Sequence, residues 1–172
     1  MEIRDAVESD LREITEIYNE VLLTSTAIFN DRPATVEERI GWWRGRVQQG
    51  YPVVVASHGG AVVGFATFGD FRTWPGYRYT VEGTIHVGAA ARRSGVGAAL
   101  LKVLIERARV AGKHVMVAGV DAANVASLQF LERHGFERVG YLREVGYKFD
   151  RFLDLIFLQY GLSNIEVGNK VQ

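Results

Sequence analysis

The residues from Ile85 to Gly112 constrain the fold of this chain more than any other stretch. They have the pattern of a strand end, a basic loop that contains glycine, and a long amphipathic helix. On the predicted helix, apolar residues recur at helical spacing with charged residues between them: Val96, Leu100, Val103, Leu104, Ala108 and Ala111. Gly112 is placed to end the helix in a left-handed conformation. The stretch therefore predicts a strand–loop–helix unit.

The loop before this helix combines Arg92 and Arg93 with Gly95 and Gly97. Backbone N–H groups at a helix start have no intrahelical partner, and the helix dipole is positive there. Because glycine has no Cβ, Gly95 and Gly97 let a ligand approach those N–H groups. The two arginines add fixed positive charge beside them. This combination predicts a binding site for a phosphate or pyrophosphate group.

Two common phosphate-binding motifs do not match the loop. A P-loop requires Gly-Lys-Ser/Thr after its glycines, and no such sequence follows Gly97. A dinucleotide-binding fingerprint requires a third small residue where Leu100 stands. From this stretch alone, an ordinary glycine-containing turn between a strand and a helix remains an open alternative.

Composition narrows the class of protein and its partners. The chain has 172 residues with 20 basic and 20 acidic side chains, so the zero net charge gives no reason to expect a nucleic-acid partner. It has no cysteine, which excludes disulfides and thiolate nucleophiles, and its four histidines show no metal-ligand spacing. The charged N-terminus and the absence of a long apolar run predict no membrane partner and a cytoplasmic location.

Periodicity and turn signals predict the order β-α-α-β-β-β-α-β-α-β-β. Asp10 is expected to cap the first helix with Glu13, and Thr35 with Glu38 to form a capping box for the second helix. The apolar face of the second helix is predicted to be Ile40, Trp43 and Val47. Strands are predicted at 3–6, 53–57, 61–68, 79–87, 115–120, 137–147 and 149–158, with the long helix over 96–111 and a further helix over 121–134.

Arg92-x-x-Gly95-x-Gly97, followed by Asn124 and then Gly135-Phe136, resembles the acyl-CoA-binding pattern of the GNAT superfamily of N-acetyltransferases. The resemblance extends over nearly the whole chain. It implies an α/β (α+β) fold with a central mixed, mostly antiparallel sheet flanked by helices. One β-α-β crossover would contain the acetyl-CoA loop. Residues 1–162 are expected to form a single domain and 163–172 a polar tail.

Further segments resemble the phosphinothricin and methionine sulfoximine acetyltransferase subgroup. These segments are 26–30, 69–72, 77–78 with 80–82, 114–118, and 146–149 with 153–155. The likeness implies acetyl-CoA as co-substrate and a small amino-acid analogue as acceptor, such as phosphinothricin, methionine sulfoximine or methionine sulfone. It also implies a homodimer and a role in antibiotic or herbicide resistance.

Glu82 is the candidate catalytic base. It lies in the middle of a predicted strand and shares one face with Thr80, Thr84 and His86. Partial burial would raise the pKa of this carboxyl towards the range of a general base, acting directly or through a water. The alternative is a salt bridge to Arg78 or Arg72. His86 is a second candidate base, although its place beside the loop favours packing or cofactor contact.

The resemblance assigns a set of residues to acetyl-CoA. The strand that contains Glu82 is expected to separate from the next parallel strand, so that backbone N–H groups meet the thioester. Asn124 would bond the pantetheine arm or serve only as a helix N-cap, and Arg133 would contact a CoA phosphate or solvent. The full cofactor set is Ile85, His86, Val87, Arg92, Arg93, Ser94, Gly95, Val96, Gly97, Ala98, Asn124 and Arg133.

One position departs from the family pattern. Many GNAT enzymes have a tyrosine seven residues after the asparagine, as the acid that protonates the departing thiolate. Leu131 stands there in this chain. No general acid is therefore assigned.

The acceptor is expected to bind beside the loop before the Glu82 strand. Arg72 is suited to a carboxylate, since arginine binds this group with two parallel hydrogen bonds. Trp74 and Phe29 would form pocket walls or merely pack on the surface. Lys148 is expected to face solvent, the alternative being a positive charge near the pocket. The predicted acceptor-binding residues are Phe29, Arg72, Thr73, Trp74, Glu82, Gly83 and Thr84.

Two other functions remain open from the sequence. One is acetylation of a peptide or protein N-terminus or of a polyamine, for which an open groove would be expected. The other is a non-catalytic acyl-CoA-sensing module. Leu131 favours the sensing module and Glu82 disfavours it.

Overall fold

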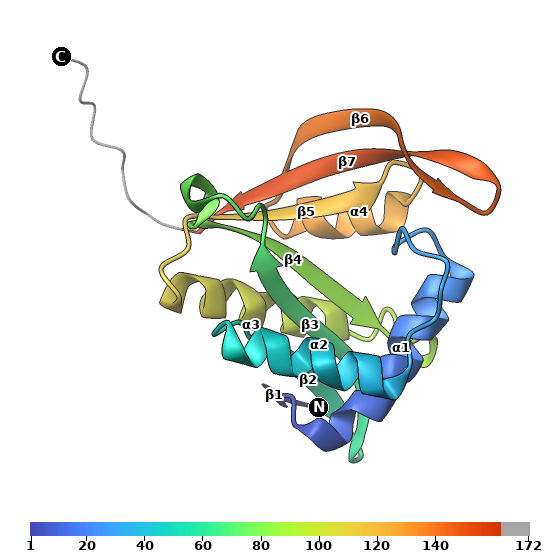
Figure 1. Ribbon diagram of the computed structural model, residues 1–172, viewed down its shortest axis with the longest axis vertical. Helices are drawn as coiled ribbons and strands as arrows, with labels where there is room; N and C mark the ends of the chain where they lie inside the picture. Colours follow the sequence, from blue (N-terminus) through green and yellow to red (C-terminus); the bar gives the residue numbers. More distant parts are fainter. Residues whose placement is uncertain (163–172) are drawn as a thin grey trace.

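The computed structural model describes residues 1–162, which contain one mixed sheet. Its strands lie in the order β1-β2-β3-β4-β5-β7-β6 (Figure 1). Only β4 and β5 pair in parallel, and the other neighbours are antiparallel. The strands are β1 (Glu2–Asp5), β2 (Val53–His58), β3 (Ala61–Asp70), β4 (Thr80–Val87), β5 (Val115–Asp121), β6 (Glu137–Lys148) and β7 (Arg151–Gly161). The expected sheet and element order are confirmed.

Helices cover both faces of this sheet, and two clusters of buried apolar side chains lie under them. Alternation along β2 separates the clusters, because Val54 belongs to the first, whereas Val53 and Val55 belong to the second. The first cluster includes α3 and α4 residues, and the second α1 residues with α2 packed against them. The helices are α1 (Leu11–Thr24), α2 (Val36–Gln48), α3 (Val96–Val110) and α4 (Val125–Arg133), with short 3₁₀ turns η1 (Glu8–Asp10), η2 (Pro75–Tyr77) and η3 (Ala89–Ala91).

Local signals in the sequence placed several element ends correctly. Gly112 adopts φ = 68° just after α3, as expected of a left-handed helix terminator. At the start of α2, Thr35 Oγ1 accepts from Glu38 N at 3.2 Å, and Glu38 Oε2 accepts from Thr35 N at 2.8 Å. This reciprocal pair is the predicted capping box.

Three local predictions are wrong. Asp10 makes no side-chain cap bond to α1, because its carboxylate accepts from Val7 N and pairs with Arg4. Phe149 begins no strand, because Phe149 and Asp150 form the turn between β6 and β7 with φ of 51° and 56°. Val47 is not on a buried face of α2 but is 55% exposed. The sheet-facing side of α2 instead includes Arg39, which is buried.

The pairing between β4 and β5 is short. It joins Thr80–Glu82 to Val115–Val117 and then stops, although both strands continue for several residues. In Figure 1 the two strands lie together near the start of β4 and diverge towards its end. Past Glu82, the main-chain groups of β4 that face β5 therefore have no strand partner. The expected separation of the two strands is present.

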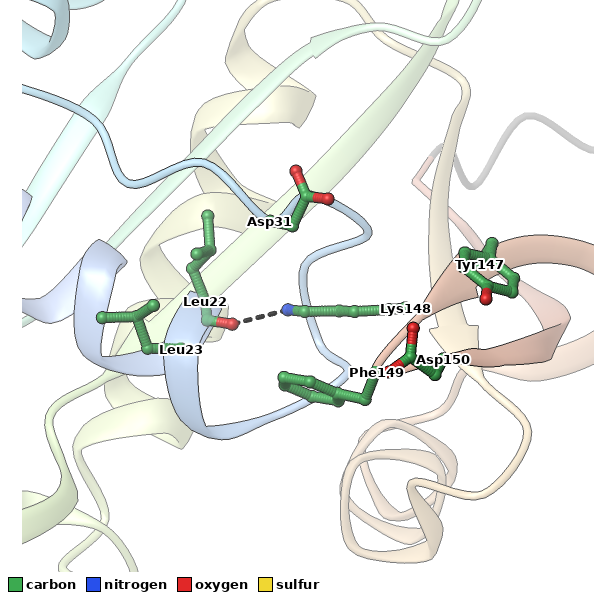
Figure 2. Close-up of a pocket in the computed structure, with 7 residues that line it drawn as sticks. All are labelled: Leu22, Leu23, Asp31, Tyr147, Lys148, Phe149 and Asp150. Carbon is green, nitrogen blue, oxygen red and sulfur yellow. Dashed lines mark hydrogen bonds between the residues drawn. The ribbon is translucent and has the colours of Figure 1, made fainter.

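Lys148 does not face solvent as predicted. Its side chain is 4% exposed, and its Nζ donates to the carbonyl oxygens of Leu22 at 2.5 Å, Ser25 at 2.8 Å and Ile28 at 2.7 Å. Figure 2 shows it crossing from the hairpin of β6 and β7 to the end of α1, beside a cavity of about 170 Å³. The ammonium satisfies carbonyls at the end of α1 and in the loop that follows it. Lys148 therefore joins the loop after α1 to the hairpin.

Replacing Lys148 tests this connection. We expect Lys148→Met to lower the free energy of unfolding by about 2 kcal/mol or more, since three carbonyl groups lose their shared donor. Urea denaturation measures the loss. The control is Lys102→Met on the exposed side of α3, which we expect to change stability by less than about 0.5 kcal/mol. Equal effects of the two substitutions would contradict the role of Lys148.

Candidate functional site

Glu82 lies where β4 and β5 stop pairing, and two glycines flank it on the sheet. Gly69 of β3 is its direct partner across the antiparallel pair. On the other side, a Cβ added to Gly119 of β5 would lie 3.4 Å from Glu82 Oε1. The carboxylate is half-buried, and the surface around it is free of side chains from these two positions. The two glycines therefore let other groups approach the carboxylate closely.

The surroundings of Glu82 raise its pKa above the ordinary value for a glutamate. Burial is the largest cause, because it penalises the charged form, and the positive charges of Arg72 and Arg46 oppose it. No ion pair to Glu82 within 4 Å is found among residues 1–162. Arg78, an expected partner, instead donates to Pro75 O at 3.0 Å and lies over the Tyr79 ring. Glu82 is thus a carboxyl held partly out of water beside two guanidinium groups.

His86 lies farther along the same face and is poorly suited to be a base. Burial, with help from the charge of Arg39, lowers its pKa to about 4. Its ring packs against Phe65 and Tyr18. The guanidinium of Arg39 is itself enclosed by aromatic rings, 3.7 Å from the Trp42 centroid and 4.4 Å from the Tyr18 centroid. The geometry favours the packing alternative for His86.

The loop between β4 and α3 has the backbone geometry expected of an anion-binding turn. Gly95 occupies the N-cap of α3 with φ = 87°, and Val96 is the first helical residue. The first intrahelical bond comes from Ala99 N to Gly95 O, so the preceding N–H groups have no partner in the helix. Ser94 Oγ closes the turn by donating to Ala91 O. Arg93 also takes a left-handed φ of 63°.

Arg92 has a different place from its neighbours in the loop. Its Nε donates to Val87 O at 3.1 Å, and its guanidinium pairs with Glu20 of α1 at 2.8 Å. It therefore connects the loop to the end of β4 and to α1. Ile85 and Val87 point into the first core cluster, so they offer a ligand chiefly their main-chain groups.

Two predicted cofactor positions belong to α4. Asn124 is its N-cap, and its Oδ1 accepts from Ser127 N at 3.2 Å, which leaves the amide NH₂ for another partner. Arg133 is exposed near the end of the helix. Leu131 is 8% exposed and belongs to the first core cluster. At the position of the missing tyrosine, the leucine side chain is thus part of the packed core.

The predicted acceptor residues do not all face Glu82. Arg72, Thr73 and Trp74 lie in the exposed loop after β3, and Trp74 is 75% exposed. Gly83 faces the opposite side of the sheet, where an added Cβ would lie 3.0 Å from the sulfur of Met116. Thr84 shares the face of Glu82. Gly83 can contribute only through its main chain to a ligand on that face.

Phe29 is held against the hairpin of β6 and β7. An added Cβ at Gly146 would lie 2.5 Å from its Cδ2, so the ring rests directly on that glycine. The loop that contains Phe29 is fixed by Lys148 and by a hydrogen bond from Thr26 Oγ1 to the buried Asp121 at the end of β5. The long-range contacts place this loop beside the strand ends near the opening between β4 and β5.

Arg46 of α2 is a residue near Glu82 that sequence reasoning missed. Its guanidinium lies on Gly69, with Cζ 2.5 Å from the place that a Cβ would take. A signal existed in the spacing of Arg39, Trp42 and Arg46, which share one helix face.

Two features are absent from residues 1–162. No helix in this part of the chain is both long and apolar enough to cross a membrane. Within the same residues, no cluster of three His, Cys, Asp or Glu side chains could hold a metal ion.

Comparison with known proteins identifies the family. The Acetyltransferase (GNAT) family model matches residues 11–136. The chain belongs to the GNAT acetyltransferase family. An L-methionine sulfoximine/L-methionine sulfone acetyltransferase of Salmonella typhimurium is 45% identical to this GNAT protein over 95% of each chain. A phosphinothricin N-acetyltransferase of Streptomyces coelicolor is 33% identical over 92% of this chain and 95% of the relative.

A solved GNAT structure matches a similar share of this chain. The phosphinothricin acetyltransferase of Sinorhizobium meliloti, determined in complex with acetyl-CoA, superimposes with a TM-score of 0.90 and 37% identity. The match covers 93% of this chain and 87% of the other. The fold and the family resemblance inferred from the sequence are confirmed, and this GNAT protein is an acetyltransferase.

The raised pKa of Glu82 can be tested by titration. We expect ¹³C NMR of the side-chain carboxyls to give Glu82 a pKa above the ordinary value of about 4.3. Comparison with Glu82→Gln assigns the resonance. Arg72→Gln should raise this pKa further, since it removes a positive charge that favours the carboxylate. Arg78→Gln is the control and should leave it unchanged. A pKa at or below the ordinary value would contradict the electrostatic description.

Proposed function

We propose that the protein transfers the acetyl group of acetyl-CoA to the amino group of a small amino-acid analogue. The proposed acceptors are L-methionine sulfoximine, L-methionine sulfone and phosphinothricin. The observation that carries this proposal is the 45% identity, over 95% of each chain, to an acetyltransferase named for the first two compounds. The position of Glu82 beside the diverging strands supports it.

Glu82 is the base in this proposal. It accepts a proton from the acceptor ammonium, directly or through a water, and the neutral amine then attacks the thioester carbonyl. An N–C bond forms, the C–S bond breaks, coenzyme A departs as a thiolate, and the nitrogen releases its second proton to solvent. No covalent intermediate with the protein is needed. Leu131 is buried where many relatives have a tyrosine, so we assign no side chain to protonate the thiolate.

The unpaired main chain of β4 past Glu82 would receive the thioester. Backbone N–H groups of Ile85 and Val87 are the candidate donors to the carbonyl oxygen, where negative charge develops, whereas alternation directs the N–H of His86 to β3, as it does that of Gly88. The turn formed by residues 93–98 would bind the pyrophosphate through N–H groups at the start of α3. Asn124 would bond the pantetheine arm through its free NH₂, and Arg133 a phosphate of CoA. Arg92 would support the turn through its pair with Glu20.

The acceptor would lie on the face of the sheet that Glu82 shares with Gly69 and Gly119. Arg72 would bind an anionic group of the acceptor, and Thr73 and Trp74 would close over it from the same loop. Phe29 would form the far wall, because its ring is fixed against Gly146. Thr84 and the main chain of Gly83 would contact the acceptor beside the base.

The protein is proposed to act as a cytoplasmic homodimer that confers resistance to such analogues. The hairpin of β6 and β7 supports the dimer, since β6 is the edge strand of the sheet. Its exposed apolar side chains, of which Tyr147 and Phe152 pack together at 5.1 Å, would be covered by a second copy. The absence of cysteine agrees with a reducing compartment.

An acceptor panel tests the proposed reaction. Purified protein with acetyl-CoA should release free thiol in the presence of methionine sulfone, methionine sulfoximine or phosphinothricin, and much more slowly with spermidine or a peptide with a free N-terminus. Preference for spermidine or the peptide would contradict the proposed acceptor class. Acetyl-CoA binding without thiol release from any amine would instead indicate a sensing module.

Substitution of Glu82 tests the assignment of the base. We expect Glu82→Gln to lower kcat by about 10²-fold or more, because a general base contributes a factor of this size. Calorimetry should find acetyl-CoA affinity unchanged, since the cofactor turn lies at the other end of β4. Thr80→Val serves as the control, because Thr80 is the preceding residue on the same face of β4. This variant should retain activity. Full activity of Glu82→Gln would remove Glu82 from this role.

A further inference from the structure

The guanidinium of Arg46 takes the place of a missing side chain on the sheet. Gly69 has no Cβ, and Cζ of Arg46 lies 2.5 Å from where one would be. Arg46 reaches this place from α2, which packs across the strands on that face. A cation thus lies directly on the main chain of β3, and only glycine at position 69 allows it.

This cation lies over the residue that is the cross-strand neighbour of the candidate base. Gly69 and Glu82 are direct partners in the antiparallel pair of β3 and β4. Side chains at such positions lie on the same face with their Cβ atoms about 4.5–5.5 Å apart. The positive charge of Arg46 accordingly acts on Glu82, together with that of Arg72. The guanidinium of Arg46 therefore lies next to the carboxylate on the same face, and Arg72 is close enough to act on it electrostatically.

The charges around this carboxylate are not balanced. Neither Arg46 nor Arg72 forms an ion pair within 4 Å in the part of the chain that the structure describes, although eight other pairs are present there. The charges of both arginines act on Glu82. With Glu82 ionised, two cations face one anion, and one positive charge is left for a ligand. Such a site favours a monoanion.

We propose that Arg46 binds the α-carboxylate of the acceptor, beside Arg72, while Glu82 takes the proton of its α-amino group. This inference rests on the proposed function for the identity of the acceptor. In an α-amino acid, nitrogen and carboxylate are attached to the same carbon. The group that binds the carboxylate must therefore lie within a few ångströms of the base. Arg46, on the cross-strand partner of Glu82, meets this condition.

The assignment gives the site selectivity for amino acids over simple amines. A guanidinium binds a carboxylate with two parallel charge-assisted hydrogen bonds, which an uncharged amide cannot accept equally. Spermidine, which has only positive charges, would be repelled by the same two arginines. Gly69 contributes by leaving room for Arg46, and Arg46 is thus a specificity residue.

The experiment compares L-methionine sulfone with its carboxamide, which keeps the amine and the side chain but has no anion. Calorimetry measures the affinity of each compound for the CoA-loaded protein, and thiol release gives kcat/KM. We expect Arg46→Gln to weaken binding of the acid by about tenfold or more and binding of the amide by less than about threefold. Arg46→Lys should recover part of the loss, since it keeps the charge but not the planar fork.

Gly69→Ala is the second variant, and it leaves Arg46 in the chain. The new Cβ would occupy the space of the guanidinium and displace it, so this variant should reproduce the selective loss for the acid. Arg44→Gln is the matched control, because Arg44 points from the same helix towards Glu8 and is paired at 2.8 Å. It should alter the binding of neither compound.

The possible outcomes separate this inference from the proposed function. Equal losses for the acid and the amide, or no loss for either, would overturn the role of Arg46. Failure of the wild-type protein to bind methionine sulfone more tightly than the amide would overturn it as well. Selective binding of the acid without any thiol release would support Arg46 and contradict the proposed reaction.

Discussion

The short parallel pairing of β4 with β5 is the constraint on which the rest of the site depends. Three residue pairs join these strands, and then each continues without the other. Parallel strands normally satisfy their main-chain groups along their full common length, so the unpaired groups past Glu82 require another partner. A ligand that inserts its own polar atoms between the strands is such a partner. The acidic side chain at the last pair is thereby placed at the point where such a ligand would end.

Around this opening, contacts between residues far apart in the chain hold the loops in place. Lys148 and Thr26 fix the loop after α1, so that Phe29 rests on Gly146. Arg92 connects the turn before α3 to α1. On the other side, α2 places Arg46 on β3. Each connection joins residues far apart in the chain, and together they give the exposed rim of the sheet a defined shape.

Much of this architecture could be predicted from local patterns. The turn at Gly95 and Gly97, the capping box of α2 and the alternation of Thr80, Glu82, Thr84 and His86 follow from backbone preferences and strand period. The failures have a common cause. Asp10 found a stronger partner in Arg4, Lys148 found three carbonyls, and α2 turned cationic side chains towards the sheet. In each case a tertiary contact outweighed the local preference of the residue.

The sequence by itself determined the order of elements and the positions of the glycine-containing turn and of the candidate base, because these depend on residues close together in the chain. It also determined the family, through motifs whose spacing is local. Only the tertiary structure decided which charges surround Glu82. Arg46 and Gly69 are 23 residues apart and belong to different elements, so no periodicity relates them. Their contact exists because a helix packs across a sheet, and packing distances are set by the whole core rather than by neighbouring residues.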